Sequence, residues 1–272
     1  MHLLYPCDPF DRRQPDEDYR DEFAAVRAAG LRCALFSFED FQSGAFKMLP
    51  STALQGDVVY RGWMLAPEDY ERLCHAVEAS GARMRASPHA YKRCHYLPEW
   101  YDACREFTPH TVFCTQDDDF AARLGDVGWT ACFVKDFVKS LTTFRGSVAR
   151  SAAEVSEIVD LMARYRGRIE GGICLREFED LVTDTEERYF VIDGRAHARD
   201  GDVPAIVHDI ARRINSPFFS VDIVRDSAGR LRLIELGDGQ VSDRKKWSAS
   251  KFAEMLHGCA DEALQRDQRM SD

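Results

Sequence analysis

Two lysines in an apolar segment are the first residues that point to chemistry. Lys135 and Lys139 lie in the run FVKDFVKS, inside an expected strand over 130–140. Burying an ammonium group without a partner is costly, so a bound phosphate would explain their position. Equally, both side chains could run along an edge strand and reach water. On this segment alone the two interpretations stay open.

A pair of carboxylates comes from two apolar runs that are expected to form a hairpin. Asp222 lies in the run 219–224 and Glu235 in the run 231–236, with the turn 226–229 between them. If both side chains face the same side, their charges repel unless a proton or a cation lies between them. Mg²⁺ held against nucleotide phosphates would satisfy both carboxylates. Neighbouring arginine or lysine side chains are the alternative.

Two further segments combine an apolar strand with charged ends. The run ICLREFEDL (173–181) ends in charged residues, and ERYFVIDG (187–194) begins with Glu187 and Arg188. Backbone groups at such a strand end can read an adenine ring, and a guanidinium can hold a phosphate through two parallel hydrogen bonds. A solvated hairpin mouth is the alternative, which this pattern alone favours.

The order of these segments is more informative than any one of them. A strand lysine, a helix with a capping box from Ser151 to Glu154, a Glu-Phe strand end, a Glu-Arg strand and an Asp…Glu hairpin follow one another between about 111 and 242. This order resembles the ATP-grasp superfamily. The runs VYRGW (59–63) and ELGDGQ (235–240) are similar to the clade of that superfamily named for one arginine and two lysines.

The resemblance implies a role for each matching residue. Lys135 would bind an ATP phosphate or the adenine side of the nucleotide, and Lys139 would reach a phosphate. Arg188 would stabilise the phosphoryl group during transfer. The residues implied to hold the adenine and the ribose are Arg176, Glu177, Phe178 and either Glu186 or Glu187.

The implied metal site departs from the family pattern at one position. Asp222 and Glu235 would hold Mg²⁺. Most ATP-grasp enzymes place an asparagine two residues after the last metal carboxylate, where this chain has Gly237. Asp238 or Gln240 would then supply the missing ligand, or one of the metal sites is weaker.

The resemblance implies an enzyme that activates a carboxylate as an acyl phosphate, which an amine then attacks. The leading hypothesis is an ATP- and Mg²⁺-dependent, ADP-forming ligase that makes a C–N bond between small-molecule or peptide substrates, and the resemblance also allows a homodimer. Cations around the transferring phosphoryl group suffice for this chemistry without a protein nucleophile. A kinase on the same scaffold and a non-catalytic nucleotide-binding module are the alternatives. The pair Asp222 and Glu235 argues against the module, because adenine binding alone does not need it.

Other charged residues have both a functional and a structural interpretation. Arg61 ends an apolar strand, so it is a candidate for holding the acceptor carboxylate or its acyl phosphate, while a salt bridge between domains is equally plausible. The basic run 244–246 could close on an anionic substrate, although a solvated turn is favoured. His197 could assist proton transfer, although a surface loop is favoured. Asp117, Asp118 and Asp119 precede an expected helix and are interpreted as capping residues.

The elements that must position these residues fall into two groups. Residues 1–97 alternate strands and helices, which predicts a small parallel α/β domain. Residues 98–262 end in the hairpin and predict a two-lobed α+β ATP-grasp domain, and 263–272 is expected to fray. The expected strands of the first group are 3–5, 33–38, 57–63 and 82–86, and its expected helices are 16–29 and 67–81.

Composition bounds the class of protein. The 272 residues are 45% hydrophobic and 30% charged, as in a soluble globular protein. The net charge of −10 disfavours broad binding to nucleic acid or to anionic membranes. No apolar run approaches the roughly 18 residues of a membrane helix, and the start lacks a signal-peptide pattern. The nine cysteines form no CxxC pair, and Cys94-His95 has no partners at metal-ligand spacing, so we expect free, buried thiols in a cytoplasmic protein.

Overall fold

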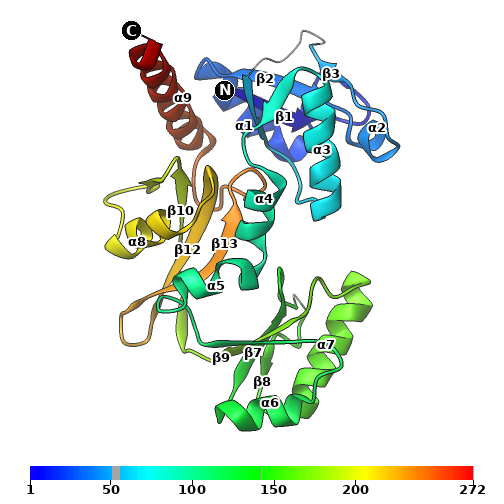
Figure 1. The fold of residues 1–272 in the computed structure, drawn as a ribbon, viewed down its shortest axis with the longest axis vertical. Helices are drawn as coiled ribbons and strands as arrows, with labels where there is room; N and C mark the ends of the chain where they lie inside the picture. Colours follow the sequence, from blue (N-terminus) through cyan, green and yellow to red (C-terminus); the bar gives the residue numbers. More distant parts are fainter. Residues whose placement is uncertain (51–55, 142, 272) are drawn as a thin grey trace.

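The computed structural model describes residues 1–50, 56–141 and 143–271, except for the side chains of 261–271. Its amino-terminal part is a five-stranded sheet with the order β3-β2-β1-β4-β5 (Figure 1). β1, β2, β4 and β5 run parallel, and β3 lies antiparallel at the edge, so the predicted parallel α/β arrangement is confirmed. The strands are β1 (His2–Pro6), β2 (Arg32–Phe36), β3 (Met48–Leu49), β4 (Gly56–Tyr60) and β5 (Ala82–Met84).

The helices of this part begin at the signals that the sequence provides. α3 (Pro67–Ala79) starts with proline at its first position and buries the face that its apolar spacing predicts. The helix expected over 16–29 is a 3-10 turn, η1 (Glu17–Tyr19), followed by α1 (Arg20–Ala28). A short helix that the sequence analysis did not predict, α2 (Phe38–Gln42), is capped by the side chain of Ser37.

The first lobe of the remaining chain is a four-stranded antiparallel sheet with the order β6-β9-β7-β8. α7 (Ala152–Arg166) packs on one face, and the hydroxyl of its N-cap Ser151 accepts the N–H of Glu154 at 3.2 Å, as the capping box predicts. α6 (Phe120–Val127) lies beside α7, and its N-cap Asp119 confirms the capping interpretation of the acidic run. The strands are β6 (Thr111–Cys114), β7 (Cys132–Asp136), β8 (Val148–Ala149) and β9 (Ile173–Glu177).

The second lobe is an antiparallel sheet with the order β11-β10-β12-β13. The predicted hairpin is present as β12 (Phe218–Asp226) and β13 (Leu231–Asp238). β10 (Leu181–Ile192) is longer than expected and turns through Asp193-Gly194 into β11 (Arg195–His197). α8 (Ala205–Arg213) covers this lobe, and α9 (Ala249–Ser271) packs on α1 of the first domain. The expected frayed tail, 263–272, lies in the segment whose side chains the structure does not describe.

Two short helices join the first domain to the lobes. α4 (Pro88–His95) packs against β13, and α5 (Leu97–Cys104) contacts α8 (Figure 1). α4 was not predicted. Trp100 on α5 and Trp247 before α9 are buried. All nine cysteines are free thiols, and seven of them are buried, which confirms their interpretation as small apolar residues.

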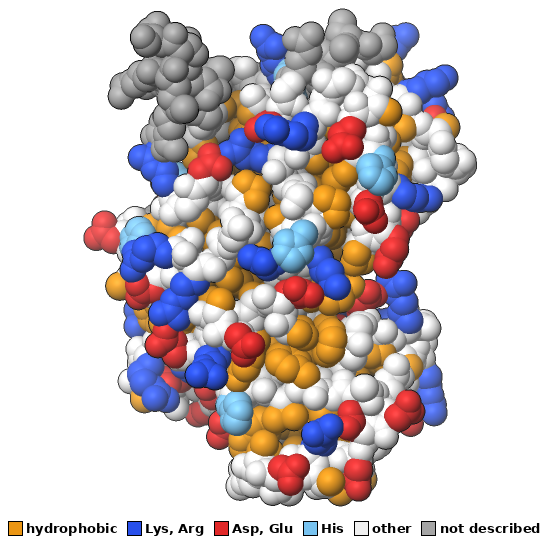
Figure 2. All heavy atoms as spheres, viewed as in Figure 1, with side chains coloured by type: hydrophobic (Ala, Val, Ile, Leu, Met, Phe, Trp, Pro, Cys, Tyr) orange, Lys and Arg blue, Asp and Glu red, His pale blue; other side chains and the backbone are white. Residues whose placement is uncertain are grey.

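The surface agrees with the mixed charge of the sequence. On the face shown in Figure 2, basic and acidic side chains are interspersed rather than gathered in one basic region. Within the described residues, no helix is both long and apolar enough to cross a membrane.

Candidate active site

The two hairpin carboxylates lie side by side. Asp222 on β12 pairs directly with Glu235 on β13, and residues opposite each other in an antiparallel ladder share a face of the sheet. The side chain of Asp222 is 3% exposed and that of Glu235 is 42% exposed. The expected juxtaposition of the two carboxylates is therefore present.

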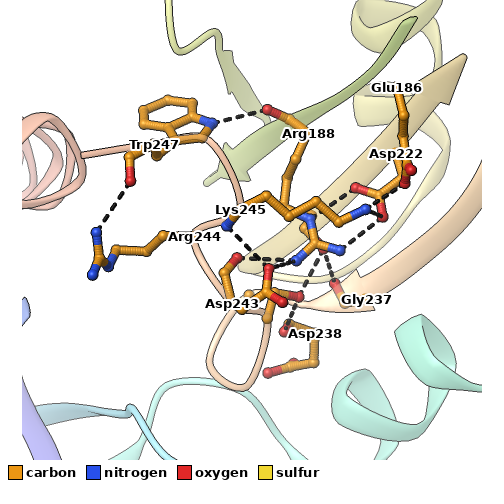
Figure 3. Close-up of polar contacts among 12 residues, drawn as sticks. Glu186, Arg188, Asp222, Gly237, Asp238, Asp243, Arg244, Lys245 and Trp247 are labelled. Atoms are coloured by element: carbon orange, nitrogen blue, oxygen red, sulfur yellow. Dashed lines mark hydrogen bonds and ion pairs between the residues drawn. The ribbon is translucent and has the colours of Figure 1, made fainter. Parts of the chain in front are cut away.

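Cations neutralise both carboxylates. Arg188 on β10 donates from Nε and Nη2 to the two oxygens of Asp222 at 2.8 and 2.7 Å, and Lys245 Nζ lies 2.9 Å from Asp222 Oδ2. Figure 3 shows the guanidinium of Arg188 between Asp222 and Asp243. Burial opposes the charge of Arg188, but Asp222 outweighs it, so the pKa of the guanidinium is raised.

The two expected lysines occupy different positions. Lys135 is buried on β7 and donates from Nζ to Glu235 Oε1 at 3.0 Å, which bridges the two lobes. Lys139 is exposed in the turn after β7. The carboxylate of Asp136 fixes that turn by accepting the N–H groups of Val138 and Lys139 at 2.8 and 2.6 Å. Asp136 is thus a positioning residue that the sequence analysis missed, although its place between the two lysines marks it.

The donor set at the hairpin fits one Mg²⁺. Asp222 and Glu235 supply hard oxygen ligands from neighbouring strands, and a nucleotide phosphate would complete the shell. A Cβ at Gly237 would lie 2.7 Å from Ser242 Oγ and 2.8 Å from Ser220 Oγ, so an asparagine there needs these serines to move. Within the described residues no group of three or more His, Cys, Asp or Glu side chains could hold a metal ion.

Asp238 and Gln240, the expected substitutes for the missing metal ligand, contact each other in a buried cluster. Both are fully buried, and Asp238 Oδ1 accepts hydrogen bonds from the backbone N–H and the side-chain amide of Gln240 at 3.0 and 3.1 Å. The same amide donates to Tyr70 Oη at 2.7 Å, so the cluster faces the first domain. These contacts make Asp238 part of an interdomain packing cluster.

The buried Asp238 gives a pH dependence of stability. Burial raises its pKa to about 7, whereas an exposed aspartate titrates near 4. Between these values the folded state keeps the proton that the unfolded state has lost, so the free energy of unfolding falls as pH rises from about 4 to about 7. Asp238→Asn should remove this loss, on the order of 3 kcal/mol, in urea unfolding at pH 5 and pH 8. Identical pH dependence in the two proteins would contradict it.

The strand end that is expected to bind the adenine forms backbone hydrogen bonds within the protein. The backbone N–H groups of Glu177 and Phe178 donate to the carbonyls of His110 and Ala131 at 2.7 and 3.2 Å. Both side chains are exposed, and the ring of Phe178 is 45% exposed. A nucleotide base there would therefore meet an exposed aromatic surface rather than two free amides.

Arg176 joins the two lobes instead of projecting freely. It is buried on β9 and donates to the carbonyl of Ile234 at 2.9 Å and to Thr108 Oγ1 at 2.6 Å. Burial lowers the pKa of this guanidinium. These contacts connect the two lobes, in addition to the nucleotide contact that the resemblance implies for Arg176.

The basic run after the hairpin pairs with the carboxylates expected at the ribose. Lys245 contacts Glu186, and Lys246 Nζ lies 2.9 Å from Glu187 Oε1. Arg244 contacts Glu22 of the first domain at 3.2 Å. The run is therefore ion-paired, and Lys245 and Lys246 are also exposed to solvent, as the favoured interpretation of a solvated turn predicts.

Arg61 is enclosed by contacts within the protein. The side chain is 2% exposed, and its Nε and Nη2 donate to the carboxylate of Glu22 at 2.6 and 2.8 Å. Its Nη1 donates to the carbonyls of Gly239 and Gln240 at 2.6 and 2.9 Å. A guanidinium enclosed in this way ties the first domain to the loop after β13 and presents little to a substrate. The ion pair with Glu22 lies within residues 1–97, so the contacts that cross to the later part of the chain are the hydrogen bonds to the two carbonyls rather than the expected salt bridge.

The structure draws attention to His95 rather than to His197. His197 lies half-buried on β11, where its Nε2 is 3.6 Å from Cys259 Sγ of α9. His95, at the end of α4, lines two cavities beside the charged cluster. The sequence analysis treated His95 only as a metal ligand without partners, and a lone histidine at the end of an unpredicted helix carries no other signal.

The two cavities share one wall. The first, of about 160 Å³, is lined by Arg188, Glu235 and the loop after β13. We call it the phosphoryl cavity. The second, of about 170 Å³, is lined by Arg166, Arg168 and Glu170. We call it the side cavity. The residues common to both linings are Met64, His95, Val138 and Lys139.

Solved structures share this architecture along the whole chain. The D-cycloserine synthetase DcsG has a TM-score of 0.62 and 16% identity, covering 95% of this chain and 99% of that protein. The D-alanine–D-alanine ligase from Coxiella burnetii has a TM-score of 0.65 and 13% identity, covering 99% and 98%. The ATP-grasp ligase PsnB, complexed with a minimal precursor, has a TM-score of 0.58 and 16% identity, covering 94% and 98%. At these identities the likeness shows the fold.

The sequence itself gives the family. No curated protein matches significantly. The family model that matches is an ATP-grasp domain, family 3 of the clade named for one arginine and two lysines. It covers residues 68–256, which is more than half of the chain and includes Lys135, Arg188, Asp222 and Glu235. The chain therefore belongs to family 3 of this ATP-grasp clade.

Proposed function

We propose that this protein is an ATP- and Mg²⁺-dependent ligase that joins a carboxylate to an amine through an acyl phosphate. The observation that supports this most is the meeting of Lys135, Arg188, Asp222 and Glu235 between the two lobes. Two cations and two carboxylates in one place match the needs of phosphoryl transfer, which are charge neutralisation and a metal anchor. The neighbours named above as ligases and as a synthetase are consistent with it.

The ion pairs of the site suggest which contacts would be exchanged when the substrates bind. Lys135 would move from Glu235 to an ATP phosphate, which frees the Glu235 carboxylate for a metal ligand role. Arg188, held by Asp222 and Asp243, would face the γ-phosphoryl group from the phosphoryl cavity. A bound Mg²⁺ would add charge neutralisation at the phosphates. Each exchange replaces one ion pair by another, so no unpaired buried charge is created.

Lys139 completes the cationic side of the phosphoryl cavity. The turn that Asp136 fixes holds it on the wall shared with the side cavity. From there its flexible side chain would reach the transferring phosphoryl group or the acceptor carboxylate. We propose Glu186, Glu187, Glu177 and Phe178 as the nucleoside side of the site, with the first two glutamates leaving their lysine partners.

Trapping of an activated carboxylate tests the proposed function. The protein is incubated with ATP, Mg²⁺, hydroxylamine and a pool of the common amino acids and small organic acids. We expect equal amounts of ADP and inorganic phosphate together with an acyl hydroxamate, because hydroxylamine attacks an acyl phosphate. A stable phosphorylated product without hydroxamate would show a kinase instead. ATP binding without any product from this pool or from peptide carboxylates would contradict the ligase assignment.

A further inference from the structure

His95 carries an unused hydrogen-bonding atom at the wall between the two cavities. It ends α4, which packs against the metal hairpin strand β13. The side chain is 5% exposed, and its Nδ1 lies 2.9 Å from the carbonyl oxygen of Tyr91. Its Nε2 is buried and has no hydrogen-bond partner among the described residues. Buried polar atoms are almost always paired, so an unpaired one next to a cavity points to a ligand.

The contact with Tyr91 fixes the tautomer of the ring. A carbonyl oxygen only accepts hydrogen bonds, so Nδ1 carries the hydrogen and Nε2 carries the lone pair. Burial lowers the pKa of His95 to about 4, with Glu235 raising it and Lys139 lowering it, so the ring is neutral at neutral pH. His95 therefore presents a neutral hydrogen-bond acceptor and base between two cavities whose linings hold both cations and carboxylates.

The shared wall offers no other base. Of the four side chains common to the two cavities, Met64 and Val138 are apolar, and Lys139 is a cation that only donates. The phosphoryl cavity contains Arg188 and Glu235, where the acyl phosphate would form. An amine that approaches from the side cavity must pass this wall to reach it.

We propose that Nε2 of His95 accepts the proton of the attacking amine, which approaches through the side cavity. This inference rests on the proposed ligase function. The amine nitrogen forms a bond to the acyl carbon, one N–H proton passes to Nε2, and the C–O bond to the phosphate breaks. The proton then passes from His95 to the departing phosphate, so the sum is an amide and inorganic phosphate. The adduct of the amine is far more acidic than free ammonium, and the phosphate brings negative charge that favours the imidazolium.

The side cavity also limits the amine. Its volume of about 170 Å³ suits a small amine or the end of a longer chain, and Arg166, Arg168 and Glu170 give it charges of both signs. A free amino acid meets both conditions, since it has an amine and a carboxylate in a small volume. We therefore assign an amino-acid-sized zwitterion as the class of amine.

The test compares two nucleophiles in the native enzyme and in His95→Asn. Asparagine keeps a donor near the Nδ1 position for Tyr91 and removes the acceptor at Nε2. Pooled amino acids supply the carboxylate in both reactions. Hydroxylamine is uncharged at neutral pH and needs little help from a base, whereas the amino group of an amino acid must lose a proton. We expect amide formation to fall about a hundredfold or more in His95→Asn, because general base catalysis contributes roughly 10²–10⁴-fold. Hydroxamate formation should stay within about threefold of the native rate.

Three controls separate the proposal from a structural role. His197→Asn, which alters a half-buried histidine on β11, should leave both products unchanged. His95→Gln, whose amide can accept a hydrogen bond but takes no proton, should lose amide formation as His95→Asn does. Thermal melting and ATP binding of each variant check that it folds.

Each outcome decides the matter. An equal fall of amide and hydroxamate in His95→Asn would show that His95 is only structural, and no fall in either would also overturn the proposal. If the native enzyme makes hydroxamate but no amide from any amino acid, the ligase activation stands and the assigned class of amine is wrong. If it makes neither product, the proposed function itself fails, together with this inference.

Discussion

Replacing Glu235 by alanine should lower ATP-dependent ADP release by about a hundredfold to a thousandfold, the cost of removing one preorganised charge-stabilising group from an active site. Glu235 faces Asp222 across the hairpin, and it is the partner of Lys135 between the lobes. The change therefore removes one of two proposed metal ligands and leaves the buried ammonium of Lys135 without its carboxylate. ADP release is measured over a range of Mg²⁺ concentrations, where excess metal should not restore the rate.

A carboxylate in the same hairpin provides the control. Asp226 lies at the far end of β12, where it accepts hydrogen bonds from the turn and pairs with Arg230 at 2.7 Å. Asp226→Asn should lower stability without lowering ADP release per folded molecule. Equal loss of activity in both variants would mean that the hairpin fold, rather than the carboxylate of Glu235, is what the reaction needs.

Arg61→Ala should lower the free energy of unfolding by about 3–5 kcal/mol, the range for breaking a buried ion pair from one side. The change leaves the carboxylate of Glu22, which is 3% exposed, with only Tyr5 and Arg244 as partners among the residues that the structure describes. It also leaves the carbonyls of Gly239 and Gln240 without their donor. Urea unfolding monitored by tryptophan fluorescence measures the loss.

The matched control for Arg61 is an exposed arginine of the same domain. Arg83 pairs with Asp57 at 2.7 Å, but its side chain is 74% exposed, so Arg83→Ala should cost less than about 1 kcal/mol. The account of Arg61 fails if Arg61→Ala unfolds at the native urea concentration while ATP turnover disappears. That result would return Arg61 to the substrate-holding role that its sequence position allows.

Local patterns were sufficient to predict the hairpin, α3 and the cap of α7. In each of these, the residues that decide the structure are neighbours in sequence: two apolar runs around a turn, a proline at the first position, or serine and glutamate three residues apart. The side-by-side placement of Asp222 and Glu235 follows from the hairpin itself. Two apolar runs joined by a short turn were enough to predict it.

Contacts between distant segments could not be predicted in this way. Asp238 is enclosed with Gln240 and Tyr70, and Tyr70 lies on a helix of the other domain. Arg61 likewise contacts the distant residues Glu22 and Gly239, which its sequence position at the end of a strand does not reveal. His95 gains its interest from an unpaired Nε2 and two adjoining cavities, which are properties of the assembled lobes.

Transfer of oxygen between substrate and phosphate tests the central claim most directly. Once the hydroxylamine assay has identified a carboxylate, that acid is labelled with oxygen-18 in its carboxyl group and incubated with ATP, Mg²⁺ and the amine. An acyl phosphate donates one carboxyl oxygen to the departing phosphate, so we predict one labelled oxygen in each inorganic phosphate. Unlabelled phosphate, or label retained in a stable phosphorylated product, would contradict ligase chemistry at this site.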